Sequence, residues 1–246
     1  MEKKKRNRKK RVLLLAAIVI LLAMGMVFYL LDYYHANDTA MAELEQSAAG
    51  VEIIRKDDQI VFQPAEAKAG LIFYPGGKVA FESYAPLLEA CAEKGILCVI
   101  VQMPANLAVL NQNAADGIQE EYPQIQTWYL GGHSLGGTVA AIYLEDHAEE
   151  YDGLILLASY STADLSGYDI KVLSVYGSLD GVMNREKYAK CKSMLPASLK
   201  EVIIEGGCHA YFGSYGEQDG DGVATITPEE QQRRTVQEIT SFILQS

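Results

Sequence analysis

Apolar and polar residues alternate along this chain with two distinct periods. Short, continuous apolar runs predict buried strands at residues 70–74, 96–103, 128–132, 154–158, 171–176 and 201–204. Apolar residues at helical spacing predict helices at residues 82–94, 106–118, 135–150, 184–194 and 228–244. Residues 51–64 predict two further strands joined by a polar turn. Buried strands separated by helices form parallel sheets, so the pattern predicts an α/β fold, a mostly parallel sheet of about seven to eight strands with helices on both faces.

The first 31 residues follow a different pattern. Residues 12–31 are uncharged, and a helix of this length spans about 30 Å, the thickness of the bilayer hydrocarbon. Eight Lys or Arg residues precede the run, and such a cluster stays on the cytoplasmic side of a membrane. We therefore predict a basic cytoplasmic tail at residues 1–11, a transmembrane helix at residues 12–31, a juxtamembrane spacer at residues 32–50 and an extracytoplasmic domain at residues 51–246.

A cleaved signal peptide is the alternative for this N-terminal segment. Ala40-Met41-Ala42 offers a cleavage site of small residues, but it lies about ten residues beyond the apolar run. The apolar run is also longer than the apolar h-region of a signal peptide, which usually has about 7–15 residues. We therefore favour an uncleaved anchor.

Composition narrows the range of functions. The net charge is −11 although residues 1–31 are strongly basic, so the rest of the chain is acidic and a poor match for nucleic acid. The four cysteines form no Cys-x-x-Cys pair, which argues against a zinc site or thioredoxin-like chemistry. We expect four free and mostly buried thiols, at Cys91, Cys98, Cys191 and Cys208.

The most informative motif is Gly132-His133-Ser134-Leu135-Gly136. It follows an apolar strand and precedes a helical segment, which is the context of a nucleophile elbow. Glycines flank the serine because bulky side chains would collide at so tight a turn. The turn presents the Ser134 hydroxyl at the N-terminus of a helix, where the helix dipole favours a developing negative charge. Ser134 is therefore the predicted nucleophile.

A serine nucleophile needs a base and an orienting carboxylate, and both are expected on loops at the carboxyl ends of strands. His209 follows the last predicted strand, and Asp180 follows the strand at residues 171–176 within Gly177-Ser178-Leu179-Asp180-Gly181. Asp164 follows an earlier strand and is the alternative acid. We favour Asp180 because its glycine-flanked turn is short.

Two backbone donors for an oxyanion are also predicted. One is the N–H of Leu135, directly after the nucleophile. The other comes from Pro75-Gly76-Gly77-Lys78, the loop after the strand at residues 70–74, with Gly77 as the first choice and Lys78 as the second.

Together these motifs resemble those of an α/β-hydrolase of the small, capless, dienelactone-hydrolase-like type, and more closely a bacterial membrane-anchored α/β-hydrolase family. The resemblance covers roughly residues 51–246. It implies a triad of Ser134, Asp180 and His209. Cys208 departs from the asparagine expected before the histidine. Dienelactone hydrolases use a cysteine nucleophile, so the serine argues against that specific reaction.

The sequence therefore predicts a serine hydrolase that cleaves small-molecule carboxylic esters, or thioesters or amides, without a cofactor or metal. A peptidase or acyltransferase with the same triad, or a non-catalytic surface binding module, are the alternatives. The acidic segment at residues 211–227 has EF-hand-like spacing, but Val223 stands where calcium binding needs an oxygen ligand and Ala224 where it needs glycine. We interpret it as a solvated loop beside the site.

Overall fold

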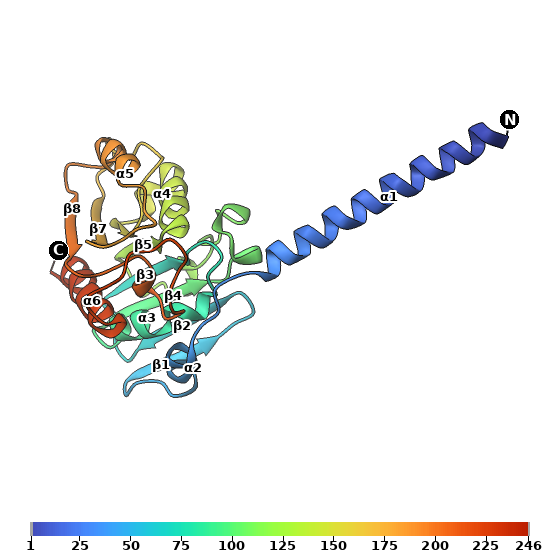
Figure 1. The fold of residues 1–246 in the computed structure, drawn as a ribbon. Helices are drawn as coiled ribbons and strands as arrows, with labels where there is room; N and C mark the ends of the chain where they lie inside the picture. The colour runs from blue at the N-terminus through green and yellow to red at the C-terminus, as the bar shows by residue number, and fades with distance from the viewer. Residues whose placement is uncertain (1, 246) are drawn as a thin grey trace. The chain divides into compact units, whose positions relative to one another are not determined.

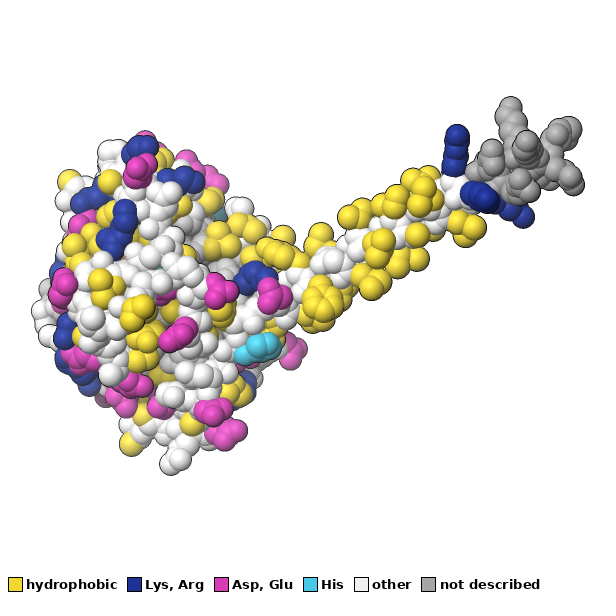
Figure 2. Space-filling view, viewed as in Figure 1, with side chains coloured by type: hydrophobic (Ala, Val, Ile, Leu, Met, Phe, Trp, Pro, Cys, Tyr) yellow, Lys and Arg dark blue, Asp and Glu magenta, His cyan; other side chains and the backbone are white. Residues whose placement is uncertain are grey.

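The computed structural model describes residues 2–245 and divides the chain into two units, residues 1–33 and residues 34–246. In the first unit, α1 (Glu2–Leu31) contains a segment of 23 residues, Lys9–Leu31, with a mean hydropathy of 2.8. Length and composition would let it cross a membrane, and a signal sequence would satisfy the same criteria. Figure 2 shows apolar side chains along this helix. Of the predicted basic tail, the side chains of residues 1–8 lie outside the described residues.

The second unit is built on one eight-stranded sheet (Figure 1). Its strands are β1 (Val51–Arg55), β2 (Gln59–Pro64), β3 (Ala69–Tyr74), β4 (Ile96–Val101), β5 (Trp128–His133), β6 (Gly153–Leu157), β7 (Lys171–Gly177) and β8 (Lys200–Ile204). The strand order is β1-β2-β4-β3-β5-β6-β7-β8. β2 pairs antiparallel with β1 and β4, and every other pair is parallel. The predicted fold class is confirmed.

Helices cover both faces of the sheet, and the central strands β3 and β4 are accordingly buried at every position. Side chains alternate in direction along a strand, so Leu71 and Phe73 of β3 face one core and Ile72 and Tyr74 face the other. The first core lies under α3 (Ala85–Ala92) and α6 (Pro228–Leu244), and the second lies under α4 (Leu135–His147). The remaining α-helices are α2 (Asp38–Glu45) and α5 (Arg185–Cys191). The parallel strands β3–β8 end at one edge of the sheet, which we call the catalytic edge because the sequence predicts the catalytic residues there.

The helix predicted at residues 106–118 is wrong. Ala105 and Asn106 have φ values of 53° and 56°, and two successive left-handed residues cannot start an α-helix. Only short 3₁₀ turns follow, at Ala108–Leu110 and Gln119–Glu121. The buried Tyr74 hydroxyl replaces helical hydrogen bonds: it donates to the Gln112 carbonyl at 2.7 Å and accepts from the Ala115 N–H at 3.0 Å.

The segment at residues 34–50, which we predicted as a spacer, contributes to the second unit. Within it, α2 begins after Asn37, whose side chain accepts a hydrogen bond from the Ala40 N–H, and packs against α3. Residues 158–170, which join β6 to β7, contain no helix or strand. As the sequence predicts, no cap domain enters there.

Candidate active site

The predicted nucleophile lies on a strained turn between β5 and α4. Ser134 has φ 51° and ψ −121°, values that non-glycine residues seldom adopt. Its N–H donates to the Leu157 carbonyl at 2.9 Å, and its carbonyl accepts from the Ser159 hydroxyl at 2.7 Å. A Cβ at Gly136 would lie 2.3 Å from the carbonyl oxygen of Pro75, which explains the glycine. Hydrogen bonds on both sides therefore hold the strained backbone in place.

The predicted base and acid are bonded to each other. The His209 Nδ1 lies 2.9 Å from Asp180 Oδ2, and both side chains are buried. The other carboxylate oxygen, Oδ1, accepts from the N–H groups of Val182 at 2.9 Å and Met183 at 2.8 Å. An ionised Asp180 can only accept, so Nδ1 carries the proton and Nε2 has a free lone pair. That tautomer is the one a general base at Nε2 requires.

Ser134 and His209 line the same cavity, which has a volume of about 270 Å³. It lies at the catalytic edge, and its remaining lining residues are Leu135, Thr138, Ala158, Ser159, Tyr160, Thr162, Val182, Met183 and Asn184. The alternative acid, Asp164, is exposed and accepts from the backbone and hydroxyl of Ser166. The structure therefore brings together Ser134, Asp180 and His209, from the ends of β5, β7 and β8. Their catalytic roles remain predictions.

The predicted oxyanion donors also lie together. A Cβ at Gly77 would be 2.9 Å from Cδ2 of Leu135, so the loop after β3 packs closely on the start of α4. The Gly76 N–H donates to the Tyr84 hydroxyl, and the N–H of Lys78, our second choice, donates to the Asn106 carbonyl at 2.7 Å. Within residues 2–245, no hydrogen bond involves the backbone N–H of Gly77 or Leu135. This pattern favours Gly77 over Lys78.

A buried network that the sequence did not reveal joins the oxyanion loop to the histidine loop. The Tyr84 hydroxyl accepts from the Gly76 N–H at 2.9 Å and lies 2.8 Å from His133 Nδ1. His133 Nε2 lies 3.2 Å from the carbonyl oxygen of His209. A carbonyl only accepts, so His133 carries its proton on Nε2 and accepts from Tyr84 at Nδ1. Burial, with nearby His209, holds the pKa of His133 well below its ordinary value, which keeps the ring neutral.

Asp221 plays a supporting role that the sequence also did not reveal. Its carboxylate accepts from four backbone N–H groups: Gly181 at 3.1 Å, His209 at 3.1 Å, Ala210 at 2.8 Å and Gly222 at 2.8 Å. Burial opposes its ionisation, but these donors hold the pKa of Asp221 below its ordinary value. Asp221 thus fastens the acid loop to the histidine loop, and our interpretation of it as part of a solvated loop is wrong. No local motif marks this role, because its partners come from two separate loops.

The thiol beside the predicted base is not reactive. Burial raises the pKa of Cys208 to about 12, so at neutral pH the nucleophilic thiolate is absent. Its backbone N–H and carbonyl bond to the side chain of Gln231 on α6, at 2.9 Å and 2.8 Å. All four cysteines are free, and three of them are buried, as predicted.

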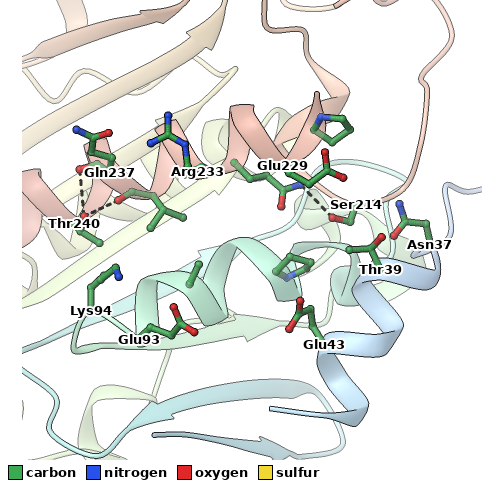
Figure 3. Close-up of a pocket in the computed structure, with 15 residues that line it drawn as sticks. Asn37, Thr39, Glu43, Glu93, Lys94, Ser214, Glu229, Arg233, Gln237 and Thr240 are labelled. Atoms are coloured by element: carbon green, nitrogen blue, oxygen red, sulfur yellow. Dashed lines mark hydrogen bonds between the residues drawn. The ribbon is translucent and has the colours of Figure 1, made fainter. Parts of the chain in front are cut away.

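A larger cavity, of about 570 Å³, lies away from these residues, between α2, α3 and α6 (Figure 3). We call it the helical groove. Its lining side chains include Asn37, Glu43, Lys94, Arg233 and Gln237. None of Ser134, Asp180 and His209 lines it, and Figure 3 shows polar side chains that project from three separate helices without converging on a reactive group.

With the geometry established, comparison with known proteins decides the family. A model of the alpha/beta hydrolase family matches residues 70–233, more than half of the chain. The chain belongs to the α/β-hydrolase family. The match includes all three residues of the predicted triad and both predicted oxyanion donors.

Solved structures agree with this family at the level of the fold. TT1662 from Thermus thermophilus is 16% identical, with a TM-score of 0.57, over 79% of this chain and 98% of that one. Est1E from Butyrivibrio proteoclasticus is 15% identical, with a TM-score of 0.56, over 80% and 98%. A CIB-like hydrolase from Thermoplasma acidophilum is 17% identical, with a TM-score of 0.53, over 79% and 99%. No curated protein matches the sequence of this α/β-hydrolase family member.

Proposed function

We propose that this α/β-hydrolase is a serine hydrolase that cleaves carboxylic esters through Ser134, His209 and Asp180. The observation that carries the proposal is the hydrogen bond between buried Asp180 and His209, together with the cavity that His209 and Ser134 both line. The strained backbone at Ser134 supports it, because such strain persists where the surrounding structure holds it and concentrates at functional sites.

The mechanism follows from the arrangement of these groups. His209 Nε2 takes the proton from the Ser134 hydroxyl as Oγ attacks the ester carbonyl. The negative oxygen of the tetrahedral intermediate accepts from the N–H groups of Leu135 and Gly77, and the dipole of α4 adds to its stabilisation. His209 then donates the proton to the leaving alcohol, and an acyl-enzyme remains on Ser134. Water, activated by the same histidine, releases the acid. Asp180 orients the ring and stabilises its charged form, and no step needs a cofactor.

The location proposed for the protein rests on its N-terminal helix. Lys9–Leu31 is long and apolar enough to cross a bilayer, and basic residues precede its apolar run. We therefore propose a single-pass protein with a cytoplasmic N-terminus and the hydrolase domain outside. Carbonate-washed membranes should retain a full-length chain that begins at residue 1. A soluble form that lacks residues 1–40 would instead show a cleaved signal peptide.

An assay with soluble aryl esters tests the proposed chemistry. We expect the wild-type full chain to hydrolyse nitrophenyl esters, and Ser134→Ala to reduce kcat at least roughly 10³-fold. Ser166→Ala is the matched control, because Ser166 is exposed and its hydroxyl donates to the Asp164 carboxylate. A folded Ser134→Ala protein that keeps full activity would contradict the proposed mechanism.

A further inference from the structure

The chain enters the second unit at the catalytic edge. Tyr34 forms a parallel bridge with Val79: its N–H donates to the Lys78 carbonyl at 2.7 Å, and its carbonyl accepts from the Ala80 N–H at 2.9 Å. Val79 directly follows the loop that contains Gly77. The chain is therefore fixed beside the proposed oxyanion loop.

The entering segment is also fastened on the histidine side of the site. The Tyr34 hydroxyl accepts from the Asp219 N–H at 3.2 Å, and the Tyr34 ring lies 5.5 Å from the ring of Tyr215. The Asn37 N–H donates to the Ser214 carbonyl at 2.9 Å. These partners belong to the loop that carries Asp221. Residues 34–37 thus connect two loops that build the site.

Little chain separates this attachment from the apolar helix. α1 ends at Leu31, and three residues of extended chain reach at most about 10 Å. A helix that crosses a bilayer therefore keeps Tyr34 within about 10 Å of the point where the helix leaves the hydrocarbon. Because Tyr34 is bonded to the loops of the site, the catalytic edge is tethered near the bilayer surface.

The catalytic edge also carries most of the exposed large apolar side chains described in residues 34–245. These are Met41, Val109, Leu110, Tyr168, Leu179, Val182, Ile203 and Val223. Val109 and Leu110 follow β4, Leu179 and Val182 follow β7, and Val223, 89% exposed, follows β8. All five lie on segments that follow parallel strands, so exposed apolar side chains gather at the catalytic edge. Exposed apolar side chains gathered on one face typically mark contact with an apolar partner.

The charges on this edge restrict the partner. Glu217 and Asp219 are exposed on the loop that holds Tyr34, and both repel anions. A strongly anionic lipid surface or substrate would meet this repulsion, whereas an uncharged or zwitterionic one would not.

We propose that the catalytic edge lies against the bilayer that holds α1, and that the substrate is an uncharged or zwitterionic amphiphilic ester of that bilayer. The inference rests on the proposed function and narrows it to a substrate class. The ester enters the cavity from the lipid; its acyl carbon bonds to Ser134 Oγ as the acyl C–O bond breaks, and the alcohol leaves with the proton from His209. Water then adds to the acyl group and restores the serine.

Lipid contact can be measured without any activity. Leu110→Trp should be strongly quenched in phosphatidylcholine vesicles with brominated acyl chains, because bromine quenches only an indole that reaches the lipid. Tyr168→Trp, at an exposed position just before β7 begins and so at the opposite edge of the sheet, is the matched control and should not be quenched. The one native tryptophan, Trp128, is only 3% exposed and gives both variants the same background. Equal fluorescence of Leu110→Trp in brominated and unbrominated vesicles would overturn the proposal.

The substrate class is tested with the full chain reconstituted in phosphatidylcholine vesicles. The double variant Val109→Ser/Leu110→Ser should hydrolyse soluble nitrophenyl acetate at the wild-type rate. It should hydrolyse methylumbelliferyl oleate embedded in the vesicles roughly tenfold more slowly than wild type does. Tyr168→Ser, at the opposite edge of the sheet, should match wild type on both substrates. If the double variant hydrolyses the embedded ester at the wild-type rate, or if wild-type protein cleaves only the soluble ester, this inference is overturned. The proposed function is not affected by either result. Wild-type protein inactive on both esters contradicts the proposed function instead, while the quenching result still reports lipid contact.

Discussion

Two of the concave regions in residues 34–245 differ in what lines them, and the smaller of the two contains the residues that we propose carry the chemistry. The helical groove encloses about 570 Å³ and the cavity at Ser134 about 270 Å³. The groove lies between the surfaces of three helices, whereas the smaller cavity is lined by residues that follow the ends of β5, β6, β7 and β8. Groups from distant parts of the chain converge only at the second place. We therefore assign the proposed site by the convergence of reactive groups and not by cavity size.

Backbone strain separates the two regions further. Within residues 2–245, the non-glycine residues with positive φ are Lys78, Ala105, Asn106, Ser134 and Ala158. Each follows one of the strands β3–β6 at the catalytic edge, and none belongs to α2, α3 or α6. Strained residues cost roughly 1–3 kcal/mol each and persist where neighbouring contacts determine them. The catalytic edge is thus the part of the domain where strained backbone conformations, which lower stability, are held in place by neighbouring contacts.

Two buried carboxyl groups show the same contrast. At the site, Asp180 has a hydrogen-bond donor on each oxygen. On the helical side, Glu89 of α3 accepts from the Ala48 N–H at 2.5 Å, and burial, together with the carboxyls of Glu43 and Glu93, raises its pKa to about 7. Each oxygen of Asp180 thus has a hydrogen-bond donor, whereas burial favours the neutral form of Glu89.

The largest effect is expected from neutralising the site carboxylate. Asp180→Asn should lower kcat by roughly 10⁴-fold, because an amide stabilises the wrong histidine tautomer and no longer balances the imidazolium charge. Asp164→Asn, at the exposed alternative acid, should stay within about twofold of wild type. Steady-state rates on an aryl ester measure both, and a greater loss in Asp164→Asn would show that the acid is assigned wrongly.

Neutralising Glu89 should change stability rather than catalysis. Its folded-state pKa, about 7, lies above the ordinary 4.5, so the folded protein binds a proton that the unfolded chain releases. This contribution to the free energy of unfolding is complete below about pH 4.5 and is lost as the pH rises through 7. Wild-type stability should therefore fall by roughly 1–3 kcal/mol from about pH 5 to pH 8, and Glu89→Gln should remove that slope. Urea unfolding at several pH values measures it.

Glu52→Gln is the control for the stability measurement, since Glu52 is exposed on β1 and is not among the carboxyls that raise the pKa of Glu89. The control should keep the wild-type pH slope. An identical slope in Glu89→Gln would show that the buried carboxyl is not the group that titrates.

A smaller effect is expected for the network behind the oxyanion loop. Tyr84→Phe removes the hydroxyl that accepts from Gly76 and donates to His133, and should lower kcat about tenfold with little change in KM. Tyr143→Phe removes the hydroxyl of another buried tyrosine, which donates to Asp116 at 2.8 Å, and should leave kcat unchanged. Equal kcat in both variants would limit Tyr84 to a structural role.

The smallest effect is expected in the helical groove. Gln237→Trp places a bulky side chain in the groove from an exposed position of α6. Hydrolysis of aryl esters should stay within about twofold of wild type. A large rise in KM would mean that substrate binds in the groove, and would remove the contrast between the two regions.

The sequence predicted the parts of the site that local patterns encode. Ser134, Asp180 and His209 each lie within a few residues of an apolar strand, and parallel strands bring such loops to one edge of the sheet. Gly136 and its neighbours show where the chain approaches itself closely. These signals need only the strand pattern and the turn residues.

The features that the sequence predicted wrongly or did not reveal depend on contacts between residues far apart in the chain. The apolar spacing at residues 106–118 predicts a helix, but the Tyr74 hydroxyl, on another strand, bonds to the backbone there and the turn before it is left-handed. The roles of Tyr84 and Asp221 depend on partners from separate loops, and no periodicity records them. Such contacts become visible only when the fold is known.

Covalent labelling tests the central claim most directly. The full-length protein would be incubated with a fluorophosphonate, which reacts with activated serines, and the adduct located by peptide mass spectrometry. We predict one adduct, on Ser134, that is absent from Ser134→Ala and strongly reduced in Asp180→Asn. An adduct on a different serine, or no adduct on folded protein that still hydrolyses aryl esters, would contradict the assignment of Ser134 as the nucleophile.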